Sequence, residues 1–137
     1  MTLTVHLNSF SYIKSGIPED LTGHGGGFVF DCRFINNPGR KKEFKSITGQ
    51  HPEVITFLES QEEMTRFLHN VYDITDPAIE NYIERGFTDL MISFGCTGGQ
   101  HRSVYSAEKT KQHISDKFPG VKIILQHIQI EKGINIG

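Results

Sequence analysis

The sequence predicts an α/β fold, with residues 1–137 forming a single domain in which helices pack on a mixed sheet of about four strands. Two observations support this prediction. Segments with strand-like alternation or length are separated by segments with helical periodicity. The run 89–128 also reads as a strand, a glycine loop, a helix and a second strand, which is a βαβ unit. A chain of 137 residues is long enough for one hydrophobic core and short for two.

The first part of the chain predicts two strands. Residues 2–12 alternate between apolar and polar side chains, as in a strand with one face in the core, and the glycine-rich segment 14–27 then predicts a loop. Residues 28–35 form the second strand, in which Asp31 and Arg33 project from the same side. Buried charges are costly unless they are paired or used, so these two form a structural ion pair or line a polar site.

The middle of the chain predicts helices. Residues 52–59 indicate a short helix, and 60–63 have a capping-box pattern before the apolar helical face of 64–72. Residues 73–77 interrupt this pattern with two aspartates and a proline. A second helix is therefore expected from that proline to Gly86, a residue type typical of the position after a helix.

The last third contains the βαβ unit. The apolar run 90–94 predicts a buried strand, 95–99 a tight glycine loop, 100–118 a helix, and 121–128 a final strand. The tail 131–137 is expected to be frayed, and the chain shows no internal repeat.

Charge and cysteine content narrow the function classes. The net charge is −2, and the segment 52–90 has nine Asp/Glu against two Lys/Arg, so no overall basic excess indicates nucleic acid. Cys32 and Cys96 are far apart and fit no metal or redox spacing, so no metal is expected. Without a signal peptide or an apolar run of about 20 residues, we expect a cytoplasmic protein with no membrane contact.

The glycine loop predicts an anion site. A strand that passes through such a loop into a helix points backbone N–H groups and the positive end of the helix dipole at one place. Arg102, in the first helical turn, adds a planar donor suited to phosphate or carboxylate. His127, near the end of the neighbouring strand, is either within reach of this loop or a hydrogen-bonded core histidine.

The loop also permits an enzymatic interpretation. Cys96 and Arg102 have the C-x5-R-S spacing of cysteine-dependent phosphatases, in which the thiolate attacks a bound phosphate. Those enzymes usually have a histidine before the cysteine, whereas this chain has Gly95, and their general acid would have to be Asp73 or Asp76. The alternative is a small buried cysteine that ends a strand beside a non-catalytic anion loop.

Longer motifs resemble the C-terminal domain of the RNase adapter protein RapZ family. The resemblance rests on the runs Gly95–Tyr105 and Phe30–Pro38, and it extends from about Phe10 to Lys132 through shorter matches in the same order. It implies a non-catalytic sensor of a small phosphorylated metabolite, glucosamine-6-phosphate, which requires no cofactor. In the full-length family it also implies presentation of a small RNA to an endoribonuclease. Matched residue by residue, the implied ligand contacts are Thr97, Gly98, Gly99, His101, Arg102, Ser103, Asp31, Arg33 and Asn37.

The chain departs from the family pattern at several places. It has no Walker A motif, so the resemblance implies a stand-alone version without the N-terminal kinase-like domain. Gly39 stands where the family often has a histidine or an aromatic residue, and the basic tail is reduced to Lys132. Few basic residues therefore remain to contact RNA phosphates, and the implied RNA contacts are limited to the basic cluster of Arg40, Lys41 and Lys42.

Overall fold

A four-stranded parallel sheet organises the chain, and the computed structural model describes residues 2–133. In spatial order the strands are β2 (Gly27–Asp31), β3 (Asp89–Cys96), β1 (Thr4–Ser11) and β4 (Lys122–His127). The predicted α/β class and the βαβ unit are confirmed. The expected mixture of strand directions is wrong, because all three strand pairings are parallel. Each connection between strands therefore brings the chain back to the end of the sheet where the strands begin.

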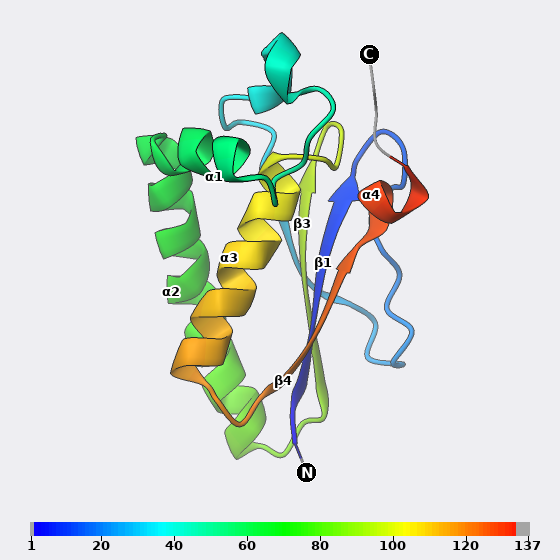
Figure 1. Cartoon of the computed structure of the whole chain (residues 1–137). Coiled ribbons are helices and arrows are strands. Elements are labelled where there is room, and N and C mark those ends of the chain that lie inside the picture. The colour runs from blue at the N-terminus through cyan, green and yellow to red at the C-terminus, as the bar shows by residue number, and fades with distance from the viewer. Residues whose placement is uncertain (1, 134–137) are drawn as a thin grey trace.

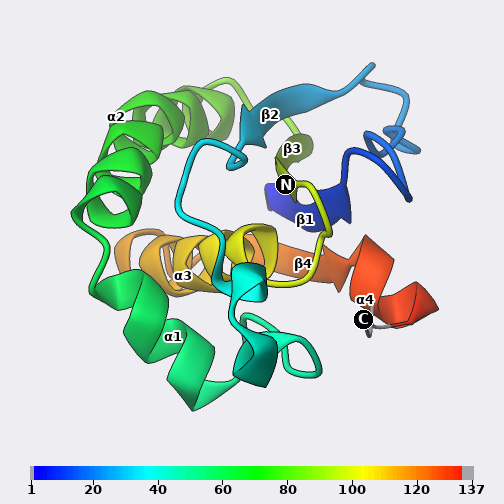
Figure 2. The ribbon, with the colours of Figure 1, turned by 90° about the horizontal axis from the view of Figure 1, so that it is seen from above.

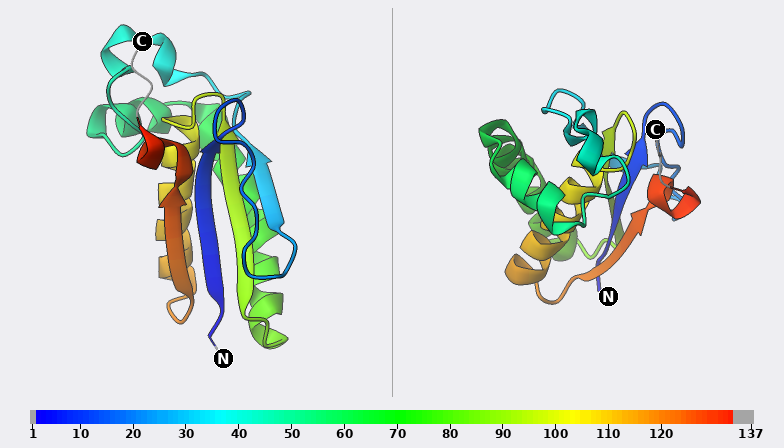
Figure 3. Two further views of the ribbon diagram at one scale, coloured as in Figure 1. Left: turned by 90° about the vertical axis from the view of Figure 1, so that its right-hand side faces the viewer. Right: turned by 45° about the horizontal axis from the view of Figure 1, so that its top comes forward.

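The helices cover one face of the sheet (Figure 1). They are α1 (Pro52–Glu59), α2 (Glu62–Glu84) and α3 (Arg102–Lys117), with a fourth short helix, α4 (Ile128–Lys132), after β4. The other face is crossed by the connection between β1 and β2, as the left view of Figure 3 shows. Two 3-10 turns, η1 (Pro38–Arg40) and η2 (Lys42–Phe44), lie at the end of the molecule where the strands terminate.

The core lies between the sheet and the helices. Alternate residues of β1 and β3 point into it, which is the period of two expected of a strand. Most buried apolar side chains from strands and helices form one continuous cluster, which includes Val5, Leu7, Ile92, Phe94, Val71, Ile79 and Ile114. The core therefore fixes the register of β3 and so the place where its terminal loop begins.

Two predictions about where elements end are wrong. The second strand ends at Asp31 rather than at residue 35, because the chain turns after the N–H of Cys32 has bonded the carbonyl of Gly95 at 2.7 Å. The expected break at 73–77 is absent, and α2 runs through Pro77 as one helix. Val71, Thr75 and Ile79 form a buried stripe, and this burial outweighs the hydrogen bond that proline removes.

One of the two predicted features at the ends of α2 is present and the other is absent. The capping box at 60–63 is not formed, because Gln61 is the N-cap residue of α2 and its side chain makes no cap hydrogen bond. Gly86 follows α2 with φ +71°, as predicted for the position after a helix. In the expected frayed tail 131–137, residues 131 and 132 belong to α4, and residues 134–137 lie outside the described part.

Candidate ligand-binding site

The loop of residues 97–101 follows β3 at the carboxyl edge of the sheet, where parallel α/β sheets bind ligands. It is held on its underside by β1, since the Ser11 hydroxyl donates to the carbonyl of Thr97 at 2.6 Å. Gly99 has φ +64°, and a Cβ there would stand 2.8 Å from the backbone nitrogen of Ser11. The loop thus requires glycine at this position and is fixed against the central strand.

One wall of the site comes from the segment 37–50, which lies over the start of α3 when the molecule is seen from above (Figure 2). Gln100 Nε2 donates to the carbonyls of Lys45 and Ile47, both at 2.8 Å. His101 Nε2 donates to the carbonyl of Phe44 at 2.8 Å. Burial lowers the pKa of His101, although the carbonyls that it faces oppose this shift. Two loop side chains therefore fasten the wall to the loop.

Arg102 is the buried cation of the site, with 3% of its surface exposed. Its Nη1 donates to the carbonyls of Arg33 and Ile35, both at 2.8 Å, and its Nε is buried without a partner among the described residues. The guanidinium is thus fixed in place by the segment that follows β2. It braces that segment and also brings an incompletely bonded charge to the site.

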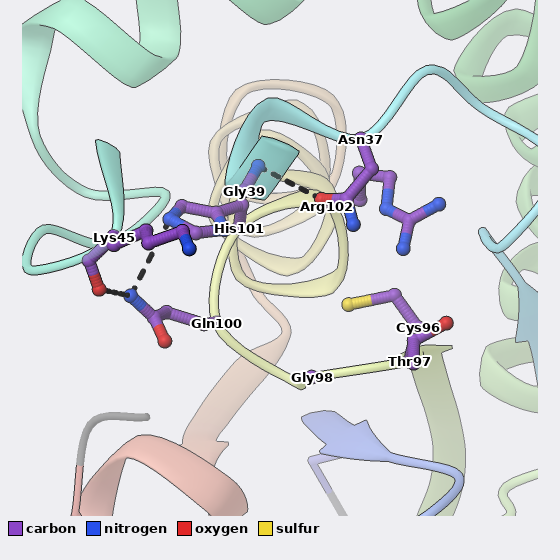
Figure 4. A pocket seen from close by; sticks show the side chains of 9 residues that line it. All are labelled: Asn37, Gly39, Lys45, Cys96, Thr97, Gly98, Gln100, His101 and Arg102. Carbon is purple, nitrogen blue, oxygen red and sulfur yellow. Dashed lines mark hydrogen bonds between the residues drawn. The ribbon is translucent and has the colours of Figure 1, made fainter. Parts of the chain in front are cut away.

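A hollow of about 290 Å3 lies between the loop and the wall (Figure 4). It is lined by Asn37, Gly39, Lys45, Cys96, Thr97, Gly98, Gln100, His101 and Arg102. Lys45 and Arg102 enter from opposite sides, and no carboxylate is among the lining residues. The N-terminus of α3 has no side-chain cap hydrogen bond, so its dipole adds to the positive potential. The arrangement suits an anion.

Five of the ligand contacts implied by the resemblance meet at this hollow, namely Asn37, Thr97, Gly98, His101 and Arg102. Two others lie beneath it. Gly99 packs against β1, and the Ser103 hydroxyl accepts a hydrogen bond from the Cys96 thiol at 3.1 Å. These two residues support the shape of the loop.

Asp31 and Arg33 form a bidentate ion pair at the surface, in which Arg33 Nη2 lies 2.7 Å from Asp31 Oδ2. The hydrogen bonds from Arg33 hold the pKa of Asp31 below its usual value, although burial opposes this shift. The Arg33 guanidinium also lies 3.9 Å from the centre of the Tyr12 ring. Of the two open readings, the geometry favours the ion pair for Asp31, whereas Arg33 also lines a neighbouring hollow.

His127 belongs to a different group of side chains. It is hydrogen-bonded to the hydroxyl of Ser9 and to the carboxylate of Glu108, both at 2.7 Å, and it does not line the hollow. Burial raises the pKa of Glu108, but the hydrogen bonds from His127 and Gln50 outweigh it and lower the value. The structure therefore favours the hydrogen-bonded core histidine.

Lining residues that the sequence did not indicate are Gly39, Lys45 and Gln100. Lys45 follows the basic cluster of Arg40, Lys41 and Lys42 in the sequence, and Gln100 belongs to the loop, but neither position alone shows which way its side chain points. Long-range hydrogen bonds, among them those of Gln100 to residues more than 50 positions earlier, bring the two together.

The residues required for phosphatase chemistry are only partly assembled. A Cβ at Gly95 would stand 2.4 Å from the Phe10 ring, so the fold has no room there for a histidine. Of the two candidate acids, Asp73 is exposed on α2, and Asp76 is bonded to His113 and Lys117. Neither lines the hollow.

Comparisons with known proteins identify the family. The model of the RapZ C-terminal domain matches residues 3–131. The chain belongs to the RapZ C-terminal domain family. It is 36% identical over 132 residues to a nucleotide-binding protein of Fervidobacterium nodosum, covering 96% of this chain and 44% of that protein. It is 41% identical over 125 residues to a nucleotide-binding protein of Lachnoclostridium phytofermentans, covering 91% and 41%.

A third relative, a nucleotide-binding protein of Nitrosomonas europaea, is 41% identical over 114 residues, which cover 83% of this chain and 38% of that protein. The chain therefore spans less than half the length of the RapZ-family relatives that it matches. Among residues 2–133, no helix is long and apolar enough to cross a bilayer. No group of three or more His, Cys, Asp or Glu in that range could hold a metal ion.

Proposed function

We propose that this RapZ-family domain binds a small phosphorylated metabolite in the hollow above β3 and does not change it chemically. The observation that carries the proposal is the buried Arg102, whose guanidinium is fixed by two carbonyls at the wall of a hollow without carboxylates. A fixed planar donor beside a helix N-terminus suits phosphate, because both offer N–H groups to its oxygens and the fixed side chain loses little freedom on binding.

The hollow favours a ligand of modest size. At about 290 Å3 it lies just below the usual range of small-molecule sites, which begins at about 300 Å3. We therefore propose a sugar phosphate for this hollow, and glucosamine-6-phosphate as the specific ligand in a sensing role. Membership of the RapZ C-terminal domain family supports this choice. The relatives are named nucleotide-binding proteins, but the chain covers less than half of each.

The test follows backbone amides by NMR while inorganic phosphate, glucosamine-6-phosphate or glucosamine is added. We expect the amides of residues 97–103 to shift with both phosphates and to stay unchanged with glucosamine. Lys45→Gln should weaken phosphate binding about tenfold, the effect of losing one charge-assisted hydrogen bond of about 1.5 kcal/mol. Lys42→Gln is the matched control, because Lys42 is exposed nearby but does not line the hollow.

Two further variants separate binding from folding. Arg102→Ala should abolish phosphate binding, but it also removes the hydrogen bonds to residues 33 and 35, so its fold must be checked by the same spectra. Cys96→Ser should leave binding largely intact. Unchanged amides of residues 97–103 at millimolar phosphate in the wild type would contradict the proposal.

The competing enzymatic proposal uses Cys96 as a nucleophile. It draws support from the position of the thiol at the edge of the hollow with Arg102. The hydrogen bond from Cys96 to Ser103 and the lack of room for a histidine at position 95 weigh against it. A burst of aryl phosphate cleavage that disappears in Cys96→Ser would establish this alternative.

RNA binding is the other alternative. The wall segment exposes Arg40, Lys41 and Lys42, which together give a basic surface for phosphates. Lys41 also lies 4.7 Å from the centre of the Phe57 ring. Salt-sensitive binding of structured RNA that is lost in the triple glutamine variant would support this function. Flat binding curves at low salt would dismiss it.

A further inference from the structure

The two cysteines of the chain lie far apart in the sequence but next to each other in the fold. β2 pairs with β3 in parallel, and Asp31 lies opposite Gly95. The N–H of Cys32 donates to the carbonyl of Gly95 at 2.7 Å, so the pairing continues for one more residue. This register sets Cys32 opposite Cys96, a neighbourhood that no spacing along the chain indicates.

Both sulfur atoms lie on the helical side of the sheet. Cys32 and Cys96 belong to the buried cluster between the sheet and the helices, and both thiols are free. The Cys96 thiol donates to the hydroxyl of Ser103 at 3.1 Å, and the Cys32 sulfur lies 3.7 Å from the hydroxyl of Ser106. Residues three apart in a helix share one face, so both sulfurs contact the same face of α3.

The backbone separation of such a pair suits a disulfide. Neighbouring strands of a sheet lie about 4.8 Å apart. The Cα atoms of disulfide-bonded cysteines usually lie about 4.4 to 6.8 Å apart. Cysteines that lie opposite each other on one side of adjacent strands can therefore be bonded by rotating their side chains, with little movement of the backbone.

The two thiols differ in their access to solvent. Cys96 lines the hollow above β3, and Figure 4 shows its sulfur among the lining side chains. Cys32 has no exposed surface and does not line this hollow. Burial raises the pKa of the Cys32 thiol, and the nearby Cys96 thiol raises it further. A buried thiol of this kind is a poor nucleophile, so a small oxidant in the hollow reacts with Cys96 first.

We propose that Cys32 and Cys96 are a reversible disulfide site, which is oxidised by a peroxide that enters the hollow. In the first step the Cys96 sulfur attacks one oxygen of hydrogen peroxide and the O–O bond breaks. The other oxygen leaves with the thiol proton as water, and Cys96 becomes a sulfenic acid. In the second step the Cys32 sulfur bonds to the Cys96 sulfur, and the sulfenic hydroxyl leaves as water with the Cys32 proton.

Two thiols and one hydrogen peroxide thus give one disulfide and two waters. A dithiol reductant reverses the reaction by exchange and is itself oxidised to a disulfide. Because each step uses only the two cysteines and these small reagents, the site does not depend on the identity of the ligand in the hollow.

The disulfide fastens the glycine loop to the end of β2. In the reduced protein Arg102 joins these two parts, through its hydrogen bonds to the carbonyls of Arg33 and Ile35. Cys32 directly precedes Arg33, and Cys96 directly precedes the loop, so the disulfide places a covalent bond between the same two parts. The oxidation state of the pair therefore controls how firmly the loop is held to the segment that leads into the wall.

Peptide mapping of the native protein after exposure to hydrogen peroxide tests the inference. Remaining thiols are blocked with N-ethylmaleimide in denaturant, and trypsin then releases the two cysteines on separate peptides, 15–33 and 86–102. We expect these peptides as one cross-linked species that lacks two hydrogens. Its yield should not depend on protein concentration, and dithiothreitol should restore both thiols.

Two variants assign the order of the steps. In Cys32→Ala, peroxide should leave Cys96 as a sulfenic acid that dimedone traps, because no second thiol is present. In Cys96→Ala, Cys32 should keep its thiol, because it is buried away from the hollow. Oxidation of Cys32 in this variant as fast as in the wild type would refute the assigned order.

The wild-type map decides the disulfide itself, whatever the stability of the variants. Unlinked peptides with Cys96 converted to sulfinic acid would refute it, and so would a link that forms only in urea or only between chains. None of these outcomes depends on phosphate binding, so the proposed function stands or falls by its own titration.

Discussion

The hydrogen bonds of Gln100 give the most direct test of how the site is held together. Its side chain is 4% exposed, and its Nε2 donates to the carbonyls of Lys45 and Ile47. Gln100→Glu keeps the shape but replaces the donor with an oxygen that faces those two carbonyls. Each lost bond costs about 1 kcal/mol, and each partly buried carbonyl left without its donor adds about 1 kcal/mol. The free energy of unfolding should therefore fall by about 4 kcal/mol at pH 7.

The loss should depend on pH in a defined direction. A carboxylate among carbonyls prefers the protonated form, so the pKa of the new Glu is raised in the folded protein. Its destabilising effect is therefore smaller below the unfolded value, near pH 4, and grows as the pH rises through the folded value. Unfolding by urea at pH 5 and pH 7, each relative to the wild type, measures this difference.

The control is Gln126→Glu, the same substitution at an exposed position of β4. It should change the free energy of unfolding by no more than about 0.5 kcal/mol. Equal midpoints for the two variants would refute the role of Gln100 in holding the wall. An unstable Gln100→Glu protein that still binds phosphate as the wild type does would show that the wall does not shape the site.

Two other predictions concern residues around the loop. Gly95→Ala should lower the free energy of unfolding by about 2 kcal/mol, because the new Cβ would press on the Phe10 ring. Thermal unfolding should show a lower midpoint for this variant. Gly120→Ala is the control and should be nearly neutral, because a Cβ at Gly120 would meet open space. The second concerns His101, whose lowered pKa means that the unfolded chain binds a proton that the folded chain excludes. Stability should therefore fall as the pH drops below about 6.5, and the fall should be smaller in His101→Gln. Identical pH profiles for this variant and the wild type would contradict it.

The βαβ unit and its glycine loop could be predicted because their signals are local. The apolar run of β3, the glycines after it and the periodicity of α3 each follow from a few neighbouring residues. Arg102 was predicted from its place in the first helical turn, and the run Gly95–Tyr105 indicated the family. These features depend on spacing along the chain, which the sequence contains directly.

Long-range packing decided the features that the sequence did not show. The continuous α2 depends on burial of the stripe around Thr75, which overrides the local signal of Pro77. Lys45 reaches the site because Gln100 binds backbone more than 50 residues earlier. His127 was within reach of the loop on spacing alone, but Ser9 and Glu108 bind it instead.

The sequence by itself determined the strand, the glycine loop and the helix that form the proposed anion site, since their backbone geometry follows from local signals. The tertiary structure alone decided what surrounds this loop. It supplied the wall at residues 37–50, the carbonyls that fix Arg102, and the Phe10 ring that leaves no room for a histidine at position 95. Contacts between residues distant in the chain depend on packing in three dimensions, and no local pattern encodes them.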